Sequence, residues 1–591
     1  MKDFLKYTLA TVVGLILASI ALFFISMLTL FGMASASESE TQVEENSVMM
    51  LNLNGTLNER NQELPLQFLL QRNELSSYGL DDILSSIRKA KENEKIKGIY
   101  LQCNMLACGH ASLQEIRNAL EDFKSSGKFV VAYADQYLQG MYYLASVADK
   151  VMLNPKGGVD WRGVASTRTF YKDLLEKVGV EMQVFKVGTY KSAVEPYMLN
   201  EMSDANREQV ECYIGSIWDE MTAAVAQSRH LTVEQLQQAA DRMMLFETAE
   251  ENVKVGLADT LIYKSDVKKY LKQLVGIEED DKLHVLDLQA MINVKKSVPR
   301  DKSGNIIAIY YAFGGIDDSS SSSFDEGIQS AKMVKDLRLL EEDEDVKAVV
   351  LRVNSPGGSA YGSEQIWYAV KQLKEKKPVI VSMGDYAASG GYYISCNADT
   401  IVAEPTTLTG SIGIFGMFPN ASKLMNDKIG LHTSTVKTNR FSDFGDISRP
   451  MNADEKAVMQ QYINRGYDLF LTRCSEGRGI DKATMDGIAQ GRVWTGAKAL
   501  ELGLVDVLGG IDKALEIAID KAGVEAYTVM SYPEKSNFMD QLLKGNIGDL
   551  LIRSYLGRSS FGPLMEQICF VEQLEGVDPI QARLPFELNI H

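Results

Sequence analysis

Two similar successions of apolar and polar segments run through the chain and predict a layered α/β protein. Near-continuous apolar runs, which predict strands, occupy residues 48–55, 96–103, 129–133 and 150–153, and again residues 306–311, 346–353, 379–383 and 400–403. Amphipathic segments that predict helices lie between them, at residues 80–91 and 113–124, and again at residues 328–340 and 363–376. Strands that are apolar throughout are typical of parallel sheets covered by helices on both faces. The pattern therefore predicts an α/β fold with mostly parallel sheets.

The two successions also match residue by residue, at an offset of 250 positions and without a gap from about residue 97 to 164. Asp135, Gly140 and Tyr142-Tyr143 of the first copy correspond to Asp385, Gly390 and Tyr392-Tyr393 of the second. A period this long indicates two domains of one fold rather than a solenoid, and a chain of 591 residues is long enough for two cores. We expect one repeat over residues 47–300, a second over 301–530, and an unassigned tail over 531–591.

The N-terminal segment predicts a membrane anchor. No charged residue occurs from Tyr7 to Met33, which is long enough to cross a bilayer as a helix. Lys2 and Lys6 precede this run and glutamates follow it, so the positive-inside rule predicts a cytoplasmic N-terminus and an exported body. We expect an anchor over residues 1–37 and a tether over 38–46. The alternative is a cleaved secretory signal ending near Ala34-Ser35-Ala36, although signal cores are shorter; both alternatives export the body.

Composition narrows the classes of partner. The net charge of −18 argues against a nucleic-acid partner, which needs a basic surface. Six cysteines are too few for a disulfide scaffold. Cys103 and Cys108, followed by His110, resemble part of a metal site, but no second pair of ligands is near in the sequence, so we expect neither a metal nor another cofactor. The two thiols are either paired or free.

Three motifs of the second repeat follow predicted strands, where open α/β sheets place their ligands. Ser355-Pro356-Gly357-Gly358 provides a tight turn with accessible backbone N–H groups, as an oxyanion site needs, although a plain strand-to-helix turn looks the same. Ser389 stands between small residues, as in a nucleophile elbow or a helix N-cap. Ser411 is either a hydroxyl that orients a base or a turn residue. In the first repeat Gln139 replaces Ser389.

The base that would activate Ser389 is predicted to come from the other repeat. None of the five histidines lies in a suitable motif, so a Ser-His-Asp triad is poorly supported. Lys191 lies in a weakly charged, aromatic stretch of the first repeat, and the corresponding stretch of the second repeat has Arg440, which cannot lose its proton. A lysine base must be neutral, so burial would have to lower its pKa by about three units. The alternative is an ordinary surface lysine.

These motifs in combination closely resemble the bacterial signal peptide peptidase A (protease IV) family in its long, tandem-domain form. The resemblance rests on residues 190–196, 355–358, 387–393 and 408–416, and it extends over nearly the whole chain. It implies two Clp-protease/crotonase-like domains and a Ser-Lys dyad without metal or other cofactor. By resemblance Ser389 is the nucleophile, Lys191 the general base and Ser411 a hydroxyl near the lysine. Gly358 and Gly390 would supply the oxyanion N–H groups.

The resemblance further implies a homotetramer held in the inner membrane by a single span, with its catalytic body on the periplasmic side, that degrades signal peptides. Two alternatives remain at this point. A crotonase-type enzyme acting on acyl thioesters would use similar glycine-rich turns, but it would not explain Ser389, Lys191 or the export signal. A non-catalytic membrane scaffold would not explain why the motifs of the second repeat are intact.

Overall fold

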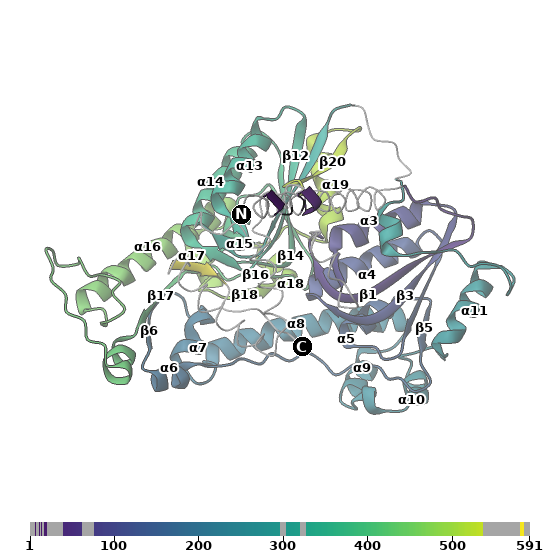
Figure 1. Ribbon diagram of the computed structural model, residues 1–591, viewed down its shortest axis with the longest axis horizontal. Helices are drawn as coiled ribbons and strands as arrows, with labels where there is room; N and C mark the ends of the chain where they lie inside the picture. The colour runs from purple at the N-terminus through teal and green to yellow at the C-terminus, as the bar shows by residue number, and fades with distance from the viewer. Residues whose placement is uncertain are drawn as a thin grey trace.

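The computed structural model describes residues 40–61, 76–295, 303–318, 327–535 and 580–583, together with isolated positions among residues 6–19. Two α/β bodies lie side by side, and the long helix α8 (Asp204–Arg229) runs beneath both of them (Figure 1). The expected anchor over residues 1–37 lies almost entirely outside the described residues. Within the described residues, no helix has the length and hydrophobicity needed to cross a membrane.

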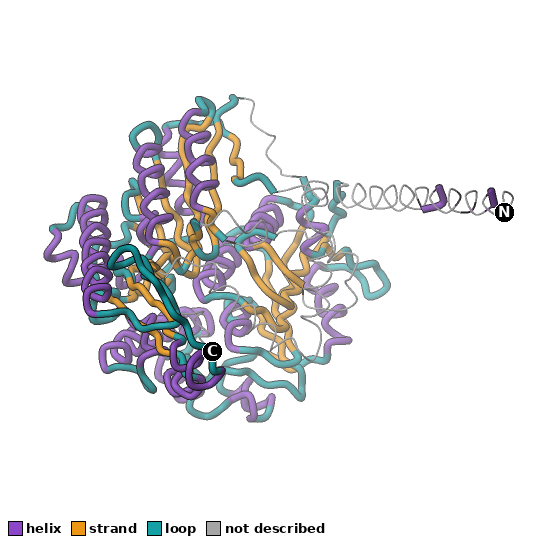
Figure 2. The backbone as a smooth tube through the Cα atoms, turned by 60° about the vertical axis from the view of Figure 1, so that its left-hand side comes forward, coloured by secondary structure: helices purple, strands orange, loops and turns teal. Residues whose placement is uncertain are grey.

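The first body is built on a parallel sheet with the strand order β2-β1-β3-β4-β5-β7, and β8 pairs with β1. Helices cover the strands in both bodies (Figure 2). The strands are β1 (Ser47–Asn58), β2 (Ser76–Gly79), β3 (Ile96–Ala107), β4 (Phe129–Ala134), β5 (Lys150–Leu153), β7 (Thr260–Leu261) and β8 (Val285–Leu286). The helices of the first half of the chain are α3 (Leu80–Glu92), α4 (His110–Lys124), α5 (Gln139–Ala145), α6 (Lys172–Val178), α7 (Glu195–Met198), α9 (Val233–Ala240), α10 (Ala249–Lys254), α11 (Lys264–Val275) and α12 (Leu288–Ile292), with the short 3-10 helices η1 (Ser192–Val194) and η2 (Met244–Phe246). Of these, α6 and α7 lie beside the second body (Figure 1).

The second body repeats this plan around a sheet with the order β18-β16-β14-β12-β9-β20, and β15 lies beside β14. Its strands are β9 (Ile306–Phe313), β12 (Val346–Ser355), β14 (Val379–Ala388), β15 (Thr400–Ala403), β16 (Leu408–Gly410), β18 (Val493–Thr495), β19 (Val507–Leu508) and β20 (Thr528–Tyr532). Its helices are α13 (Ser330–Glu342), α14 (Ala360–Lys374), α15 (Gly390–Ser395), α16 (Ala453–Arg478), α17 (Lys482–Ile488), α18 (Gly496–Glu501) and α19 (Ile511–Ala522), with the π-helix η3 (Leu424–Ile429).

Alternate residues of the central strands pack on opposite faces of the second sheet. Ala348 and Val350 contact the cluster that includes α19, whereas Val349 and Leu351 belong to the larger core on the other face. Both faces are therefore buried, which explains why the strand sequence is a continuous apolar run. The expectation of an α/β fold with mostly parallel sheets is confirmed.

The duplication extends to polar contacts. The carboxylate of Asp149 accepts a hydrogen bond from the N–H of Val130, and that of Asp399 accepts one from the N–H of Val379, each at 2.8 Å. The hydroxyl of Tyr142 donates to a backbone carbonyl at 2.9 Å, and that of Tyr392 does so at 3.0 Å. Because each contact joins matched elements, the two halves share local geometry as well as topology.

A third sheet combines both halves, in the order β11-β10-β13-β21-β17-β6. Its strands are β6 (Glu181–Lys186), β10 (Ile316–Asp317), β11 (Ile328–Gln329), β13 (Gly357–Ser359), β17 (Phe415–Asn420) and β21 (Ile580–Arg583). β6 belongs to the first half by sequence, yet it pairs antiparallel with β17, with Lys186 opposite Phe415. This pairing carries a segment of the first half onto the second.

A buried ion cluster joins the two halves. Arg352, on β12, is fully buried and contacts the carboxylates of Glu59 at 2.8 Å and of Glu115 at 2.6 Å. Nearby, Asp385 on β14 accepts hydrogen bonds from the backbone N–H and hydroxyl of Ser112 at the start of α4. Buried charges are tolerated only when they are paired and hydrogen-bonded, so this cluster requires both halves to be docked in this one arrangement.

Candidate active site

Lys191 reaches the second half on the segment that follows β6. The chain turns at Gly188, whose φ is +98°, and Lys191 lies at the start of η1. A Cβ placed on Gly491 would be 2.6 Å from the Cβ of Lys191, so the lysine packs directly on a glycine of the second half. The Lys191 side chain is fully buried, which excludes the alternative of a surface lysine.

Gln209, on the buried face of α8, holds this segment in place. Its Nε2 donates to the carbonyl oxygen of Tyr190 and to Ser192 Oγ, both at 3.0 Å. Its Oε1 accepts from the backbone N–H of Val493 at 3.2 Å. The residues on either side of Lys191 are thereby tied to β18. Sequence analysis did not single out Gln209, and its only signal was an amide on the buried side of a helix.

Ser389 lies where β14 ends and α15 begins. Its φ of 54° and ψ of −113° form a conformation that non-glycine residues rarely adopt. The backbone N–H donates to the carbonyl oxygen of Gly410 at 2.8 Å, which helps to hold this turn. The side chain makes no capping hydrogen bond to α15, so the N-cap alternative does not describe it.

The two side chains meet in a buried space together with a second hydroxyl. The distance from Lys191 Nζ to Ser389 Oγ is 2.8 Å. The same Nζ is 3.1 Å from Ser411 Oγ and 3.1 Å from the Ser411 carbonyl oxygen. Ser411 also has a positive φ, of 50°, and its N–H donates to the carbonyl oxygen of Arg492 at 2.7 Å. Lys191 Nζ therefore has three oxygen neighbours, all from serines.

Burial lowers the pKa of Lys191 from its usual value to about 7. The physical cause is desolvation, because the ammonium form loses its hydration without gaining a carboxylate partner. Among the ion pairs of the described residues, none includes Lys191. A substantial fraction of this lysine is consequently uncharged near neutral pH and able to accept a proton from a hydroxyl at hydrogen-bond distance.

Three glycines line the approach to Ser389. Gly390 is the first residue of α15, and Gly358 packs against β10 so closely that a Cβ there would lie 2.0 Å from the carbonyl oxygen of Ile316. Gly357, which sequence analysis named as part of the turn but not as an oxyanion residue, has a φ of +95°, and a Cβ on it would lie 2.6 Å from the backbone nitrogen of Gly390. The two consecutive glycines after Pro356 are the sequence feature that could have identified it. Because glycine has no side chain, these residues allow another backbone to approach closely beside Ser389.

A segment from the C-terminal tail lies against these glycines. β21 pairs antiparallel with β13, with Ala582 opposite Gly358, and with β17, with Gln581 opposite Phe415. Cβ atoms placed on Gly357 and Gly390 would lie 2.1 and 2.9 Å from the carbonyl oxygen of Ala582. The site beside Ser389 thus holds an extended peptide strand, with one of its carbonyl groups next to the glycine backbones.

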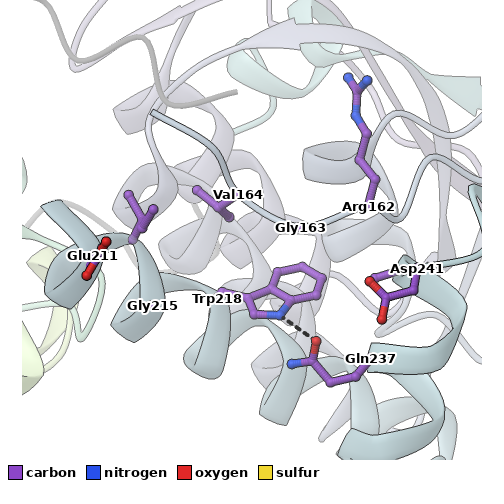
Figure 3. Close-up of a pocket in the computed structure, with 10 residues that line it drawn as sticks. Arg162, Gly163, Val164, Glu211, Gly215, Trp218, Gln237 and Asp241 are labelled. Atoms are coloured by element: carbon purple, nitrogen blue, oxygen red, sulfur yellow. Dashed lines mark hydrogen bonds between the residues drawn. The ribbon is translucent and has the colours of Figure 1, made fainter. Parts of the chain in front are cut away.

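The corresponding position in the first half has no nucleophile. Gln139 begins α5, its Nε2 donates to the carbonyl oxygen of Gly163 at 3.0 Å, and its Oε1 accepts from the N–H groups of Arg162 and Gly163, also at 3.0 Å. The Gln139 side chain therefore bonds to the backbone of the turn at Arg162 and Gly163. Beyond Gly163 a cavity of about 340 Å³ opens between this turn, α8 and α9 (Figure 3).

Other candidates from the sequence are not at the site. Arg440 lies on an exposed stretch of the second half, where it pairs with Asp454. Cys103 and Cys108 are both free thiols, and burial lowers the pKa of His110 to about 4. Within the described residues no cluster of three or more His, Cys, Asp or Glu side chains is arranged to hold a metal ion.

Comparison with known proteins gives a consistent result. The model of peptidase family S49 matches residues 122–278 and 371–525, one match in each half, and a Clp protease model matches residues 322–406. Protease 4 of Haemophilus influenzae is 35% identical over 84% of this chain and 82% of its own length. Protease 4 of Salmonella typhi is 37% identical over 80% of this chain and 77% of its own length. The chloroplastic serine protease SPPA of Arabidopsis thaliana is 31% identical over 86% of this chain and 75% of its own length.

Proposed function

Because the chain belongs to peptidase family S49 and is a serine protease with two tandem domains of Clp-protease-like fold, we propose that it cleaves peptide bonds with a Ser-Lys dyad formed across its two repeats. In this proposal Ser389 is the nucleophile and Lys191 the general base. The observation that carries the proposal is the 2.8 Å contact between Lys191 Nζ and Ser389 Oγ, made by a lysine whose pKa burial lowers to about 7. Because the chain belongs to a protease family, the two alternatives raised from the sequence, an enzyme acting on acyl thioesters and a non-catalytic membrane scaffold, have no support.

The chemistry is acyl transfer. Neutral Lys191 accepts the hydroxyl proton while Ser389 Oγ attacks the peptide carbonyl carbon. The N–H groups of Gly358 and Gly390 stabilise the oxyanion, and Gly357 permits the approach because it has no Cβ. The lysine then protonates the leaving amine, and a water molecule, deprotonated by the same lysine, releases the acyl group from Ser389. Ser411 acts as a positioning residue that keeps Lys191 Nζ directed at the nucleophile.

The binding mode of the peptide is inferred from β21. A substrate takes the same place between β13 and β17, adding an antiparallel strand to both edges. The residue at the place of Ala582 presents its carbonyl group to the glycines, and Ala582 itself is completely buried. We therefore expect small side chains to be preferred immediately before the cleaved bond.

The wider setting is proposed from the sequence. The uncharged run from Tyr7 to Met33 and the charges on either side of it support a single span in the inner membrane, with the catalytic body in the periplasm. The family resemblance supports cleaved signal peptides as substrates and a homotetrameric assembly. An apolar leftover peptide in or beside the bilayer is a suitable substrate for a protease tethered there.

Single substitutions test the dyad. Ser389→Ala and Lys191→Ala are expected to lower kcat for a model peptide by about 10³-fold or more, because each removes a reacting group. Lys186→Ala is the matched control, since it removes a lysine from the same segment but outside the buried site. Circular dichroism establishes that the variants are folded. Parental turnover in either the Ser389 or the Lys191 variant would exclude the dyad.

A further inference from the structure

We propose that Arg492 is a positioning residue of the Ser-Lys dyad, which clamps the segment carrying Lys191 against the second half and thereby keeps the lysine out of water. Arg492 lies between α17 and β18, and it directly follows Gly491, on which Lys191 packs. The proposal rests on the proposed function, because it assigns a role within that dyad.

The side chain of Arg492 contacts two aromatic rings, one from each half. Its guanidinium carbon is 4.6 Å from the centroid of the Tyr190 ring and 4.4 Å from that of the Trp494 ring. A guanidinium group is planar and permanently charged, so it stacks well on the faces of such rings. Within the described residues, no other arginine or lysine contacts two rings. Because Tyr190 directly precedes Lys191, this stack holds the segment of the lysine to the second half.

Glu208, on α8, orients both partners of the stack. Its carboxylate is 2.9 Å from Arg492 Nη2, and it accepts a hydrogen bond from the Tyr190 hydroxyl at 3.3 Å. The Glu208 side chain is 57% exposed and that of Arg492 only 18%. An ion pair that is open to solvent contributes little attraction by itself. We therefore assign the holding force to the stacked rings and the orientation to Glu208.

The backbone of Arg492 reaches the other side of the site. Its carbonyl oxygen accepts the hydrogen bond from the N–H of Ser411 at 2.7 Å, and two oxygens of Ser411 lie 3.1 Å from Lys191 Nζ. One residue thus contacts both the segment that carries the base and the serine beside the base. A substitution of the Arg492 side chain leaves the backbone contact in place, so it tests the stack alone.

The internal duplication provides a comparison for this arginine. At the offset of 250 positions the counterpart of Arg492 is Arg242. In both residues the N–H donates to the carbonyl oxygen three positions earlier, at 2.8 Å and 3.2 Å. The Arg242 side chain instead forms ion pairs with Glu247 and Glu251, and none of the cation–ring contacts of the described residues includes it. The fold therefore supplies an arginine in both halves, but only Arg492 is stacked.

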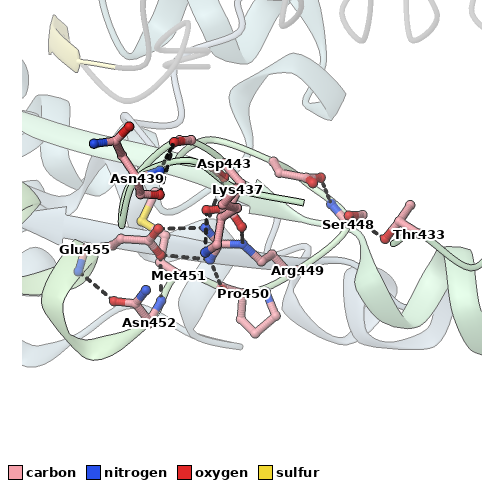
Figure 4. Close-up of polar contacts among 12 residues, drawn as sticks. Thr433, Lys437, Asn439, Asp443, Ser448, Arg449, Pro450, Met451, Asn452 and Glu455 are labelled. Carbon is pink, nitrogen blue, oxygen red and sulfur yellow. Dashed lines mark hydrogen bonds and ion pairs between the residues drawn. The ribbon is translucent and has the colours of Figure 1, made fainter. Parts of the chain in front are cut away.

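The second half also lacks the ring that such a stack would need. Residues 436–442 correspond to the Lys191 segment, and Asn439 precedes Arg440 where Tyr190 precedes Lys191. These residues are exposed, and ion pairs hold the stretch instead, from Lys437 to Asp443 at 2.9 Å and from Arg449 to Asp443 at 2.7 Å (Figure 4). The stacked arginine thus occurs where a lysine base has to be positioned.

The clamp matters because Lys191 is a base only while it stays dry. Desolvation is what lowers the pKa of Lys191 to about 7. The groups that face Nζ are the oxygens of Ser389 and Ser411, and the charged groups near the segment, Arg492 and Glu208, are paired with each other. A loosened segment would admit water, and the pKa would rise toward the usual lysine value. The pH dependence of activity therefore reports on the clamp.

Arg492→Gln in the full-length protein removes the stacked cation. We expect kcat/KM for an uncharged peptide to rise about one pH unit later than in the parent, so that it is about tenfold lower at pH 6 and within about twofold at pH 9. KM is expected to stay within about twofold, because the side chain contacts Tyr190, Trp494 and Glu208, which lie outside the strands that pair with β21. Arg242→Gln is the matched control and is expected to keep the parental profile.

Two substitutions of Tyr190 separate stacking from charge, because neither changes a charge. Tyr190→Leu removes the ring and is expected to shift the pH profile as Arg492→Gln does, and it provides the test if the Arg492 variant does not fold. Tyr190→Phe keeps the ring and loses only the contact with Glu208, so its shift is expected to be less than about half a pH unit. A loss of activity that is equal at every pH, in Tyr190→Leu or in a folded Arg492→Gln protein, would overturn the inference.

Labelling with a fluorophosphonate, followed by mass spectrometry of the peptides, separates this inference from the dyad itself. The label is expected on Ser389, and in Arg492→Gln the labelling rate should show the same shift with pH as kcat/KM. Label on Ser389 with the parental pH dependence would overturn the role of Arg492 alone. Label on another serine, or on none, would overturn the dyad and this inference together.

Discussion

At the scale of single residues, the site combines two features that are unfavourable for folding. Ser389 adopts a positive φ of 54°, and such conformations cost about 1–3 kcal/mol when the residue is not glycine. Lys191 is buried without an opposing carboxylate, so its protonated form is destabilised. Both features direct a reactive atom toward the same point. The surrounding hydrogen bonds of Gln209 and Gly410 hold these residues there.

Activity is expected to rise with pH through about 7. Lys191 is a base only when uncharged, and its pKa is lowered to about 7, so kcat/KM should increase roughly tenfold per pH unit below that value and level off above it. The pH dependence of kcat/KM for an uncharged peptide is the measurement. A plateau extending unchanged down to pH 5, or an increase only near the ordinary lysine pKa of about 10, would contradict the assignment.

Gly357→Ala is expected to lower kcat/KM by about 10²-fold or more, since the new Cβ would stand 2.1 Å from the place of the substrate carbonyl oxygen. Gly127→Ala is the matched control, because Gly127 also has a positive φ, of +80°, but its Cβ would meet no atom within 4 Å. Peptidase kinetics on both variants separate the steric effect from backbone strain. Equal losses in the two variants would show that strain alone is responsible.

At the scale of elements, sequence pattern predicted the central strands of the two sheets, and the helices between them, to within five residues. The apolar run at 346–353 is β12 (Val346–Ser355), and the helix expected over 80–91 is α3 (Leu80–Glu92). The pairing of β6 with β17 was not predictable, because periodicity describes one strand and not its partner. β21 has only four residues, and it forms a strand only because it pairs with β13 and β17, which the sequence of β21 does not reveal. The proximity of Lys191 to Ser389 was expected only from the complementary motifs of the two repeats.

The contact between α4 and β15 is expected to weaken as pH rises. Burial first, and the nearby charge of Glu115 second, raise the pKa of Glu404 to about 8. A carboxyl group whose pKa is raised on folding stabilises the folded state at low pH, and this stabilisation is lost between its unfolded pKa and about 8. Glu404→Gln should remove this part of the pH dependence, which is at most about 1.4 kcal/mol per pH unit. Urea unfolding at pH 5, 6.5 and 8 measures it.

Glu501→Gln, at an exposed glutamate of α18, serves as the control for this experiment. It should leave the dependence of unfolding on pH as it is in the parent. If the Glu404→Gln protein and the parent lose stability in parallel between pH 5 and 8, Glu404 does not titrate in the way its burial implies.

At the scale of the whole molecule, the tail and the two repeats share one sheet. β21 fills the place between β13 and β17 that we assign to substrate, so the tail competes with peptides for the site. Since the competitor belongs to the same chain, its effective concentration is high and independent of dilution. The protein therefore carries a strand that must leave before a peptide enters.

Removing residues 580–591 is expected to lower KM for a model peptide severalfold without changing kcat, because substrate no longer has to displace β21. Ala582→Glu should have the same effect, since Ala582 is completely buried and cannot accommodate a charge there. Steady-state kinetics give both constants, with an Arg583→Ala variant, at the exposed end of the strand, for comparison. A KM that neither change alters would show that the strand does not obstruct peptides.

The separation of base and nucleophile also determines when the enzyme can first work. Because a chain is synthesised from its N-terminus, Ser389 leaves the ribosome 198 residues after Lys191. In the proposed mechanism, Lys191 has no hydroxyl to activate and Ser389 has no base until the later half has been made and has folded onto the earlier one. Proteolysis by the proposed dyad would therefore start only when both halves are complete and folded together.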